Sequence, residues 1–128
     1  MRQTAGNSNS LGLVKFIFPN DSSVYLHDTD NRNLFNATDR DFSHGCVRVG
    51  SPDELADIVL KRNGGWNINS VNAAMNDVSN PERKEELSRP IPVYLNYWTS
   101  TIMGDGRVRF DQDIYRHDVT MFQRFGLQ

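Results

Sequence analysis

Two short apolar runs on either side of a polar turn open the hydrophobic pattern of the chain. Residues 13–18, LVKFIF, and residues 24–27, VYLH, are rich in the aromatic and β-branched side chains that are typical of strands. The residues between them, PNDSS at 19–23, are those that favour a tight turn. The pattern therefore predicts a β-hairpin.

The second of these runs ends in a histidine. Since alternate side chains of a strand share a face, Tyr25 and His27 should point the same way, opposite to Val24 and Leu26. The polar stretch that follows, residues 28–42, is predicted to be an irregular loop pinned by Leu34, Phe35 and Phe42.

Helical signals follow in the middle of the chain. Ser51 can cap a helix, Pro52 suits its first position, and Glu54 can complete a capping box. This helix should stop at Asn63-Gly64-Gly65. A second helix is predicted over 71–78, capped by Asn69 or Ser70, and the charged run 81–88 is either a short exposed helix or a loop.

Strand signals return near the end. Residues 93–98, VYLNYW, predict a strand, and residues 107–110 predict a returning strand after a turn at 103–106. The tail, residues 111–128, should pack as a helix or pair with a partner. The order of strands, helices and strands favours an α+β domain.

Composition narrows the possible classes of function. The chain has 128 residues, which fits one domain, and a formal net charge of −2, which gives no basic face for nucleic acid. No apolar run approaches the roughly 18 residues of a membrane span. The first twelve residues lack the apolar core of a secretory signal.

The only cysteine, Cys46, lies in the turn Ser43-His44-Gly45-Cys46. A thiol becomes a nucleophile when a base or a cation near it favours the thiolate. His27, His44 and Arg48 are the candidates. We favour His27 as the general base because it comes from a separate element, and Asp28 should hold its ring through a carbonyl or carboxylate oxygen.

The residues around the thiol suggest further roles. Gly45 removes a side chain before the nucleophile, so the amides of Gly45 and Cys46 can form an oxyanion hole. Arg48 is a cation suited to a substrate carboxylate. The residues thus indicate a cysteine-dependent acyl transferase.

Interpretations of Cys46 other than a catalytic nucleophile remain open. A lone cysteine is often a small buried apolar residue, although the polar neighbours of Cys46 argue against that. Zinc bound by His27, His44, Cys46 and Asp28 is another, but the spacing is unusual and no second cluster supports it, so neither a metal nor a cofactor is predicted. His117 is expected to be a surface or structural histidine, and Trp66 and Trp98 to be core or rim residues.

The motif of His27, a spacer and Ser43-His44-Gly45-Cys46 resembles the signature of the YkuD-type L,D-transpeptidases. Further segments resemble the YcbB-like branch of that family: HDT at 27–29, LF at 34–35, SHGCVRV at 43–49, PVYLNYWT at 92–99, DGRVRF at 105–110 and DIYRHD at 113–118. The resemblance covers most of residues 10–118. It implies a β-rich α+β catalytic fold, incomplete at its N-terminus, with two short helices after the cysteine motif.

The resemblance also implies a reaction and its residues. Cys46 would attack the carbonyl between diaminopimelate and the terminal D-Ala of one peptidoglycan stem peptide, and the amine of a second stem would resolve the thioester as a 3→3 cross-link. The implied catalytic residues are His27 as base, the carbonyl of Asp28, the amides of Gly45 and Cys46, and His44. Tyr25, Ser43 and Arg48 would contact substrate, and carbapenems would acylate Cys46.

The remaining expectations concern the rest of the protein. Residues 1–128 should be the C-terminal portion of a catalytic domain, with 1–10 and 119–128 peripheral and part of the β scaffold absent. An open sheet edge would then favour association or low stability. The parent protein would act in the periplasm and carry an anchor or export signal. An L,D-carboxypeptidase and a non-catalytic wall-binding fragment are the alternatives.

Overall fold

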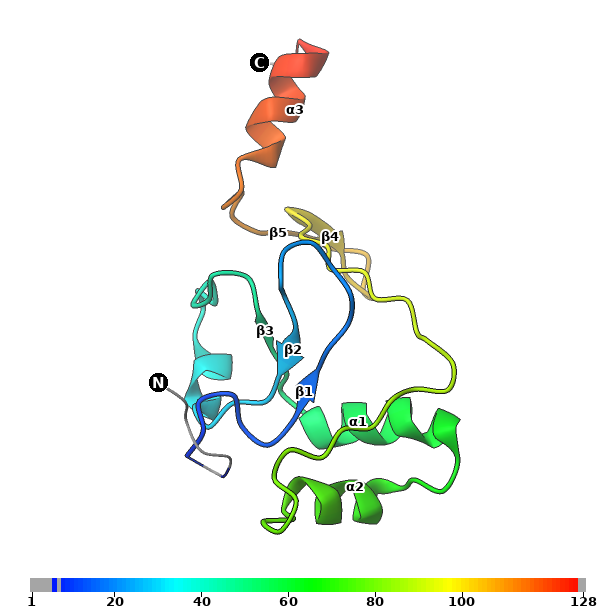
Figure 1. Ribbon diagram of the computed structural model, residues 1–128. Coiled ribbons are helices and arrows are strands. Elements are labelled where there is room, and N and C mark those ends of the chain that lie inside the picture. Colours follow the sequence, from blue (N-terminus) through cyan, green and yellow to red (C-terminus); the bar gives the residue numbers. More distant parts are fainter. Residues whose placement is uncertain (1–5, 7, 127–128) are drawn as a thin grey trace. The chain divides into compact units, whose positions relative to one another are not determined.

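The computed structural model describes residue 6 and residues 8–126, which fold into two compact units. The N-terminal unit ends at Pro92 and the C-terminal unit begins at Val93 (Figure 1). Each unit has its own sheet: the N-terminal unit adds two α-helices to it, and the C-terminal unit adds one.

A three-stranded sheet forms the centre of the N-terminal unit. Its strands are β1 (Lys15–Phe16), β2 (Leu26–His27) and β3 (Val47–Arg48), in the spatial order β1-β2-β3. β1 pairs with β2 in antiparallel fashion, and β2 pairs with β3 in parallel. The predicted hairpin is confirmed, although its strands are shorter than the apolar runs that predicted them.

The hairpin turn is held by a single side chain. The Asn20 side-chain amide donates to the Val24 carbonyl at 2.7 Å, and its oxygen accepts from the Val24 amide at 3.0 Å. An Asn side chain can thus replace a backbone partner inside a turn. The turn closes without a longer ladder between β1 and β2.

The loop between β2 and β3 contains one turn of 3-10 helix, η1 (Arg32–Asn36). Leu34 and Phe35 are partly buried, as expected of residues that pin a loop. Phe42 is 49% exposed, so the prediction that it pins the loop was wrong. The partly buried residues Leu34 and Phe35 anchor the loop instead.

Two helices follow β3. The first, α1 (Pro52–Leu60), begins with Pro52 at its first position as predicted, and η2 (Lys61–Asn63) extends it. The predicted capping box is wrong, because the Ser51 side chain makes no capping hydrogen bond. Asp53 and Glu54 in the first turn still complement the helix dipole.

The second helix, α2 (Ile68–Met75), starts three residues earlier than predicted. Asn67, rather than Asn69 or Ser70, is its cap: its side-chain oxygen accepts from the Asn69 and Ser70 amides at 2.9 and 3.1 Å. The Asn67 amide in turn donates to Ser70 Oγ. Ser70 is therefore the third residue of the helix and completes the capping box.

The core of the N-terminal unit is small. α1 packs against α2, and the two lie side by side in Figure 1. Val71 is 2% exposed and Ala56 is 3% exposed, and Pro52 is fully buried with them. The remaining buried residues are polar: His27, Asp28, Thr29 and Asp57.

The C-terminal unit holds a hairpin and a helix. β4 (Ser100–Ile102) pairs with β5 (Val108–Phe110) in antiparallel fashion, and α3 (His117–Phe125) follows. The turn at 103–106 and the returning strand are confirmed, and within the tail residues His117–Phe125 form a helix. The Asp113 carboxylate accepts from the His117 and Asp118 amides at 2.8 and 2.9 Å, which caps α3.

The strand predicted over 93–98 is absent, so that prediction was wrong. A strand needs a partner for its backbone groups, and these residues pair with no other strand among those the structure describes. Large side chains there stay exposed, among them Tyr94 at 81% and Trp98 at 68%. The charged run 81–88 forms a loop.

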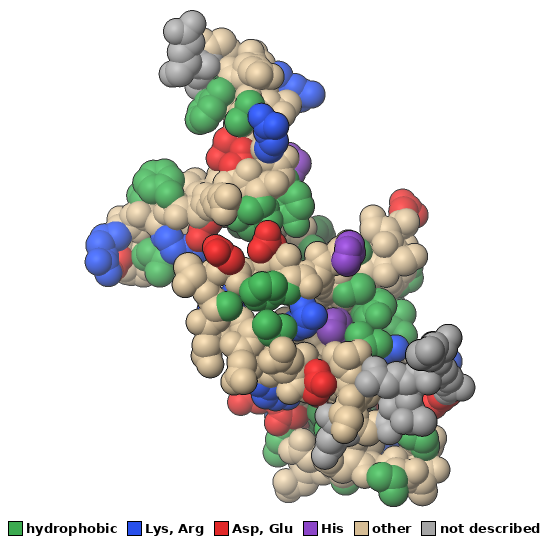
Figure 2. All heavy atoms as spheres, turned by 90° about the vertical axis from the view of Figure 1, so that its left-hand side faces the viewer, with side chains coloured by type: hydrophobic (Ala, Val, Ile, Leu, Met, Phe, Trp, Pro, Cys, Tyr) green, Lys and Arg blue, Asp and Glu red, His purple; other side chains and the backbone are tan. Residues whose placement is uncertain are grey.

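The α+β class is confirmed by the mixed sheet and the three helices. Apolar side chains reach the surface at several separate places on the face shown in Figure 2. None of the helices within the described residues has both the length and the apolar character to cross a bilayer.

Candidate active site

The cysteine turn is closed by Ser43. Its hydroxyl donates to the Cys46 carbonyl at 2.6 Å and accepts from the Gly45 amide at 3.2 Å. Gly45 has a φ of 146°, which a residue with a side chain rarely adopts, and a Cβ there would lie 3.1 Å from the Val24 side chain. The turn therefore depends on both a serine and a glycine.

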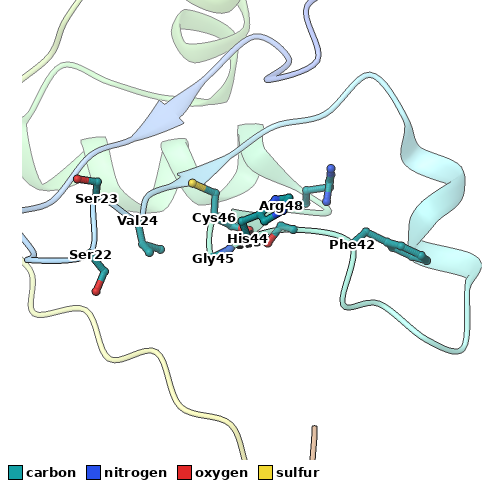
Figure 3. Close-up of a pocket in the computed structure, with 9 residues that line it drawn as sticks. Ser22, Ser23, Val24, Phe42, His44, Gly45, Cys46 and Arg48 are labelled. Carbon is teal, nitrogen blue, oxygen red and sulfur yellow. Dashed lines mark hydrogen bonds between the residues drawn. The ribbon is translucent and has the colours of Figure 1, made fainter. Parts of the chain in front are cut away.

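A pocket of about 340 Å³ lies over this turn. Figure 3 shows the Cys46 sulfur on the side of the loop that faces Ser23 and Val24, while Phe42 points away. Cys46 itself is half-buried. The residues that line the pocket come from two segments: Ser22, Ser23, Val24, Phe42, Ser43, His44, Gly45, Cys46 and Arg48.

The register of the parallel pair brings the predicted residues to one face. Leu26 is paired with Val47 and His27 with Arg48, and the Val47 amide donates to the Tyr25 carbonyl at 3.1 Å. Paired residues point to the same side of a sheet, and alternate residues share a face. Tyr25 and His27 therefore face the same way as Cys46 and Arg48.

Tyr25 links the imidazole to the thiol. Its ring meets the His27 ring edge-on, with centroids 5.8 Å apart, as its predicted place on the same face requires. Burial, the negative charge of a thiolate at Cys46, and a hydrogen bond to the Cys46 side chain together raise the pKa of the Tyr25 hydroxyl. The hydroxyl is therefore a neutral donor beside the sulfur.

His27 is 4% exposed and its ring is held in one orientation. Its Nδ1 contacts the backbone carbonyl oxygen of Asp28 closely. A carbonyl oxygen can only accept, so the proton of a neutral His27 ring lies on Nδ1 and the lone pair on Nε2. A ring in this tautomer can take a proton at Nε2.

The two kinds of oxygen of Asp28 have different partners. The carbonyl contacts the His27 ring, whereas the buried carboxylate accepts from the backbone amides of Leu13 and Thr29 and from Arg32. Of the two oxygens that we considered from the sequence, the carbonyl makes the contact.

His44 and Arg48 both line the pocket, in different environments. His44 is exposed, and Arg48 is half-buried with its Nε buried and unbonded among the described residues. His117 belongs to the C-terminal unit, at the start of α3. Within residues 6 and 8–126, no group of three or more His, Cys, Asp or Glu side chains is arranged to hold a metal ion.

Sequence reasoning missed several residues near the site. Ser22 and Ser23 line the pocket because the hairpin turn passes beside the cysteine turn, which no local signal indicates. Arg32 was also missed, although its place four residues after Asp28 is a common spacing for an ion pair.

Two comparisons with known proteins identify the family of this chain. The family model described as the YkuD L,D-transpeptidase catalytic domain matches residues 1–93. A Haemophilus influenzae protein named "Putative L,D-transpeptidase" is 43% identical over 121 residues, which is 92% of this chain and 23% of that protein. The chain thus spans about a quarter of the length of this curated relative.

Both matches are to L,D-transpeptidases, a class of acyltransferase. The chain belongs to the YkuD family of L,D-transpeptidase catalytic domains. Its assignment to the YcbB-like branch stays a prediction.

Proposed function

We propose that the chain carries the chemistry of a peptidoglycan L,D-transpeptidase that forms 3→3 cross-links through a thioester on Cys46. The parallel pairing of β2 with β3 is the observation that supports this proposal, because in its register His27 and Cys46 share one face of the sheet and the Tyr25 ring meets the His27 ring edge-on. The proposal extends to envelope peptidoglycan as substrate, and it takes the chain as part of an L,D-transpeptidase catalytic domain.

In the first half-reaction, His27 Nε2 takes the proton of the Cys46 thiol. The thiolate attacks the carbonyl carbon between diaminopimelate and the terminal D-Ala of the donor stem, and the carbonyl oxygen becomes an oxyanion. When the intermediate collapses, the carbon–nitrogen bond breaks and D-Ala leaves with the proton from His27. The product is a thioester on Cys46.

In the second half-reaction, the side-chain amine of diaminopimelate on a second stem attacks the thioester. His27 takes a proton from this amine, the carbon–sulfur bond breaks, and the departing Cys46 thiolate takes that proton from His27 to restore the thiol. The new amide is the cross-link.

The Gly45 and Cys46 amides are the proposed donors to the oxyanion. For this, the Gly45 amide must exchange its present acceptor, Ser43 Oγ, for the oxyanion. The Gly45 amide donates to Ser43 Oγ over a long 3.2 Å contact. An oxyanion is a stronger acceptor than a hydroxyl, so substrate would draw this amide away from Ser43 as charge develops. Ser43 would then hold the turn through its bond to the Cys46 carbonyl.

Arg48 and Tyr25 are the proposed substrate contacts. The guanidinium of Arg48 at the pocket suits a carboxylate of the stem peptide. The Tyr25 hydroxyl, a donor beside the sulfur, suits the carbonyl or its oxyanion. His44 is exposed at the rim, where it would meet the part of the stem that leaves the pocket.

Hydrolysis of the same thioester is a second candidate. Ser43, His44 and Gly45 are exposed around the sulfur, so water reaches the thioester as well as an amine does. Product analysis with a donor stem, with and without an amine acceptor, separates an L,D-carboxypeptidase from a transpeptidase.

Carbapenem labelling tests the proposal. A carbapenem should add its mass once to the chain, because the thiolate opens the strained lactam and stays acylated, and Cys46→Ala should remove the adduct. Intact-mass spectrometry measures both. An adduct that persists in Cys46→Ala would exclude Cys46 as the acylated group, and an unlabelled parent chain would favour the non-catalytic wall-binding fragment.

Two histidine variants provide the matched control for this experiment. His27→Ala should slow labelling on the order of a hundredfold, as expected for loss of a general base. His117→Ala removes a histidine of the C-terminal unit and should label at the parental rate. Equal rates for the two variants would contradict the role of His27.

A further inference from the structure

The position of the His27 ring depends on the peptide that follows it. The ring nitrogen Nδ1 contacts the Asp28 carbonyl, so any movement of this carbonyl rotates or shifts the imidazole. The backbone here is anchored on both sides: the Asp28 amide donates to the Val14 carbonyl and the Val49 amide donates to the His27 carbonyl, each at 2.9 Å. What holds Asp28 therefore also holds the proposed base.

The Asp28 carboxylate is the most enclosed charge near the site, with its side chain 4% exposed. It accepts from the Leu13 amide at 2.9 Å, the Thr29 amide at 2.7 Å and the Arg32 guanidinium at 2.8 Å. A buried carboxylate is costly unless a cation and hydrogen bonds compensate it. Arg32 supplies the only cation among these three partners.

Arg32 also reaches a second segment. While Nη2 binds Asp28, Nη1 donates to the Gly50 carbonyl at 2.7 Å. Gly50 lies just after β3, on the same segment as Cys46 and Arg48. One planar guanidinium therefore ties the residue that follows β2 to the segment that follows β3, which a lysine ammonium with a single nitrogen does not reproduce.

The N-terminal segment closes the other side of Asp28. Gly12 has a φ of 61°, and a Cβ at this position would collide with the Asp28 carboxyl group. Its neighbour Leu13 donates to the same carboxyl. The close approach of Gly12 and the hydrogen bond from Leu13 therefore restrict movement of the Asp28 carboxylate.

We propose that Arg32 is a positioning residue of the transpeptidase reaction, which sets the His27 ring relative to Cys46 by holding Asp28 and Gly50 at once. The inference rests on the proposed function. Arg32 does not line the pocket around the sulfur, so it acts through His27 rather than on substrate. Its side chain is 52% exposed, which makes it accessible to substitution without opening the core.

The test compares Arg32→Lys and Arg32→Met with Arg40→Met. Arg40 is the matched control, because it is an exposed arginine of the same loop whose Nε donates to the Ala37 carbonyl at 2.9 Å. Three quantities are measured on the full chain: the rate of carbapenem acylation, the pH profile of Cys46 alkylation by iodoacetamide, and the thermal unfolding midpoint. Tyr25, His44 and Arg48, the other ionisable groups at the sulfur, are unchanged in all three variants.

Both Arg32 variants should slow acylation by about 10- to 100-fold, the effect of a displaced catalytic group. Both should also move the alkylation profile toward that of a free thiol. Arg32→Lys keeps a cation for Asp28, so its unfolding midpoint should stay near that of the parent while its rate falls. Arg40→Met should match the parent in all three quantities.

Two results would overturn the inference. Parental acylation and a parental pH profile in Arg32→Lys would mean that Arg32 only neutralises Asp28. If the pH profile of Cys46 alkylation in the parent chain matched that of a free thiol, His27 would not act on Cys46. Arg32 would then have no base to position.

Failure of the proposed function is a separate outcome. The parent could show no carbapenem adduct while its alkylation profile differs from that of a free thiol and shifts in Arg32→Lys. That result would support the positioning role of Arg32 and contradict the transpeptidase function. If the parent is acylated and Arg32→Lys leaves rate and profile unchanged, the function stands and the positioning is overturned.

Discussion

The N-terminal and C-terminal units both contain apolar side chains, but the two units differ in how far these side chains are buried. In the N-terminal unit, where α1 packs against α2, Val71 on α2 is 2% exposed, and His27 on β2 is 4% exposed. In the C-terminal unit, Phe110 on β5 is 79% exposed and Phe125 on α3 is 72% exposed. None of the described residues from Val93 onward is buried.

The difference shows that apolar content alone does not make a core. Both units contain a hairpin and a helix, but only the N-terminal unit adds a third strand from a distant part of the chain and a second helix. A two-stranded hairpin by itself is marginally stable, and a third strand or a packed helix stabilises it. The site lies where this additional pairing occurs, between β2 and β3.

The largest expected effect is on stability, from core substitution in the N-terminal unit. Val71→Ala should lower the free energy of unfolding by about 2 kcal/mol, since a fully buried side chain loses two methyl groups. Phe110→Ala in the C-terminal unit should change it by less than about 0.5 kcal/mol, because the ring is largely exposed. Urea unfolding followed by tryptophan fluorescence measures both.

Val78→Ala is the control within the N-terminal unit, since Val78 is 93% exposed and should behave like Phe110. A loss in Phe110→Ala as large as that in Val71→Ala would break the comparison. It would mean that the aromatic face of β5 is covered in solution.

A smaller effect distinguishes the helix caps of the two units. Asn67→Ala should cost about 1 kcal/mol, because the Asn67 side chain accepts two amides at the start of a packed helix. Asp113→Ala removes the acceptor of two amides at the start of α3, where the apolar side chains are exposed. The second change should reduce helicity without moving the unfolding transition of the N-terminal unit.

Circular dichroism and the fluorescence of Trp66, in a Trp98→Phe background, separate these outcomes because each unit holds one tryptophan. Ser51→Ala is the control at a cap position without a side-chain bond, and it should be nearly neutral. Equal losses in Ser51→Ala and Asn67→Ala would contradict the assignment of the caps.

Local signals in the sequence allowed part of the fold to be predicted. The hairpin at 13–27 and the start of α1 at Pro52 follow from neighbouring residues, and both were predicted. The start of α2 was missed because Asn67, Asn69 and Ser70 are all good caps, and only the choice of bonds selects Asn67. The strand over 93–98 was wrong because strand formation depends on a partner that propensity does not reveal.

The site shows the same division between local and distant information. The turn Ser43-His44-Gly45-Cys46 and the link of His27 to Asp28 each join residues that are close in the sequence, so both could be recognised from local signals. The parallel register of Leu26 with Val47 and the reach of Arg32 to Gly50 join residues about 20 positions apart. No local pattern specifies such pairings, and the β2–β3 register is what places His27 and Cys46 on one face.

The smallest effect concerns the ionisation of Tyr25 and tests that shared face directly. Burial, a negative charge at Cys46 and a hydrogen bond to Cys46 raise the pKa of Tyr25 above its ordinary value of 10.0. Cys46→Ala removes the second and third causes, so the pKa of Tyr25 should fall while burial keeps part of the shift. Cys46→Ser keeps a hydrogen-bond partner without the charge and should give an intermediate pKa.

Phenolate absorbance, taken as the difference between each protein and its Tyr25→Phe variant, measures this pKa. Because the folded-state pKa is raised, the contribution of the neutral phenol to stability is complete below the unfolded-state pKa and is lost as the pH rises through the folded-state pKa. At neutral pH the hydroxyl therefore remains a donor toward the sulfur. A Tyr25 pKa that does not change in Cys46→Ala would show that the hydroxyl and the sulfur are apart, and would contradict the shared face on which the proposed function depends.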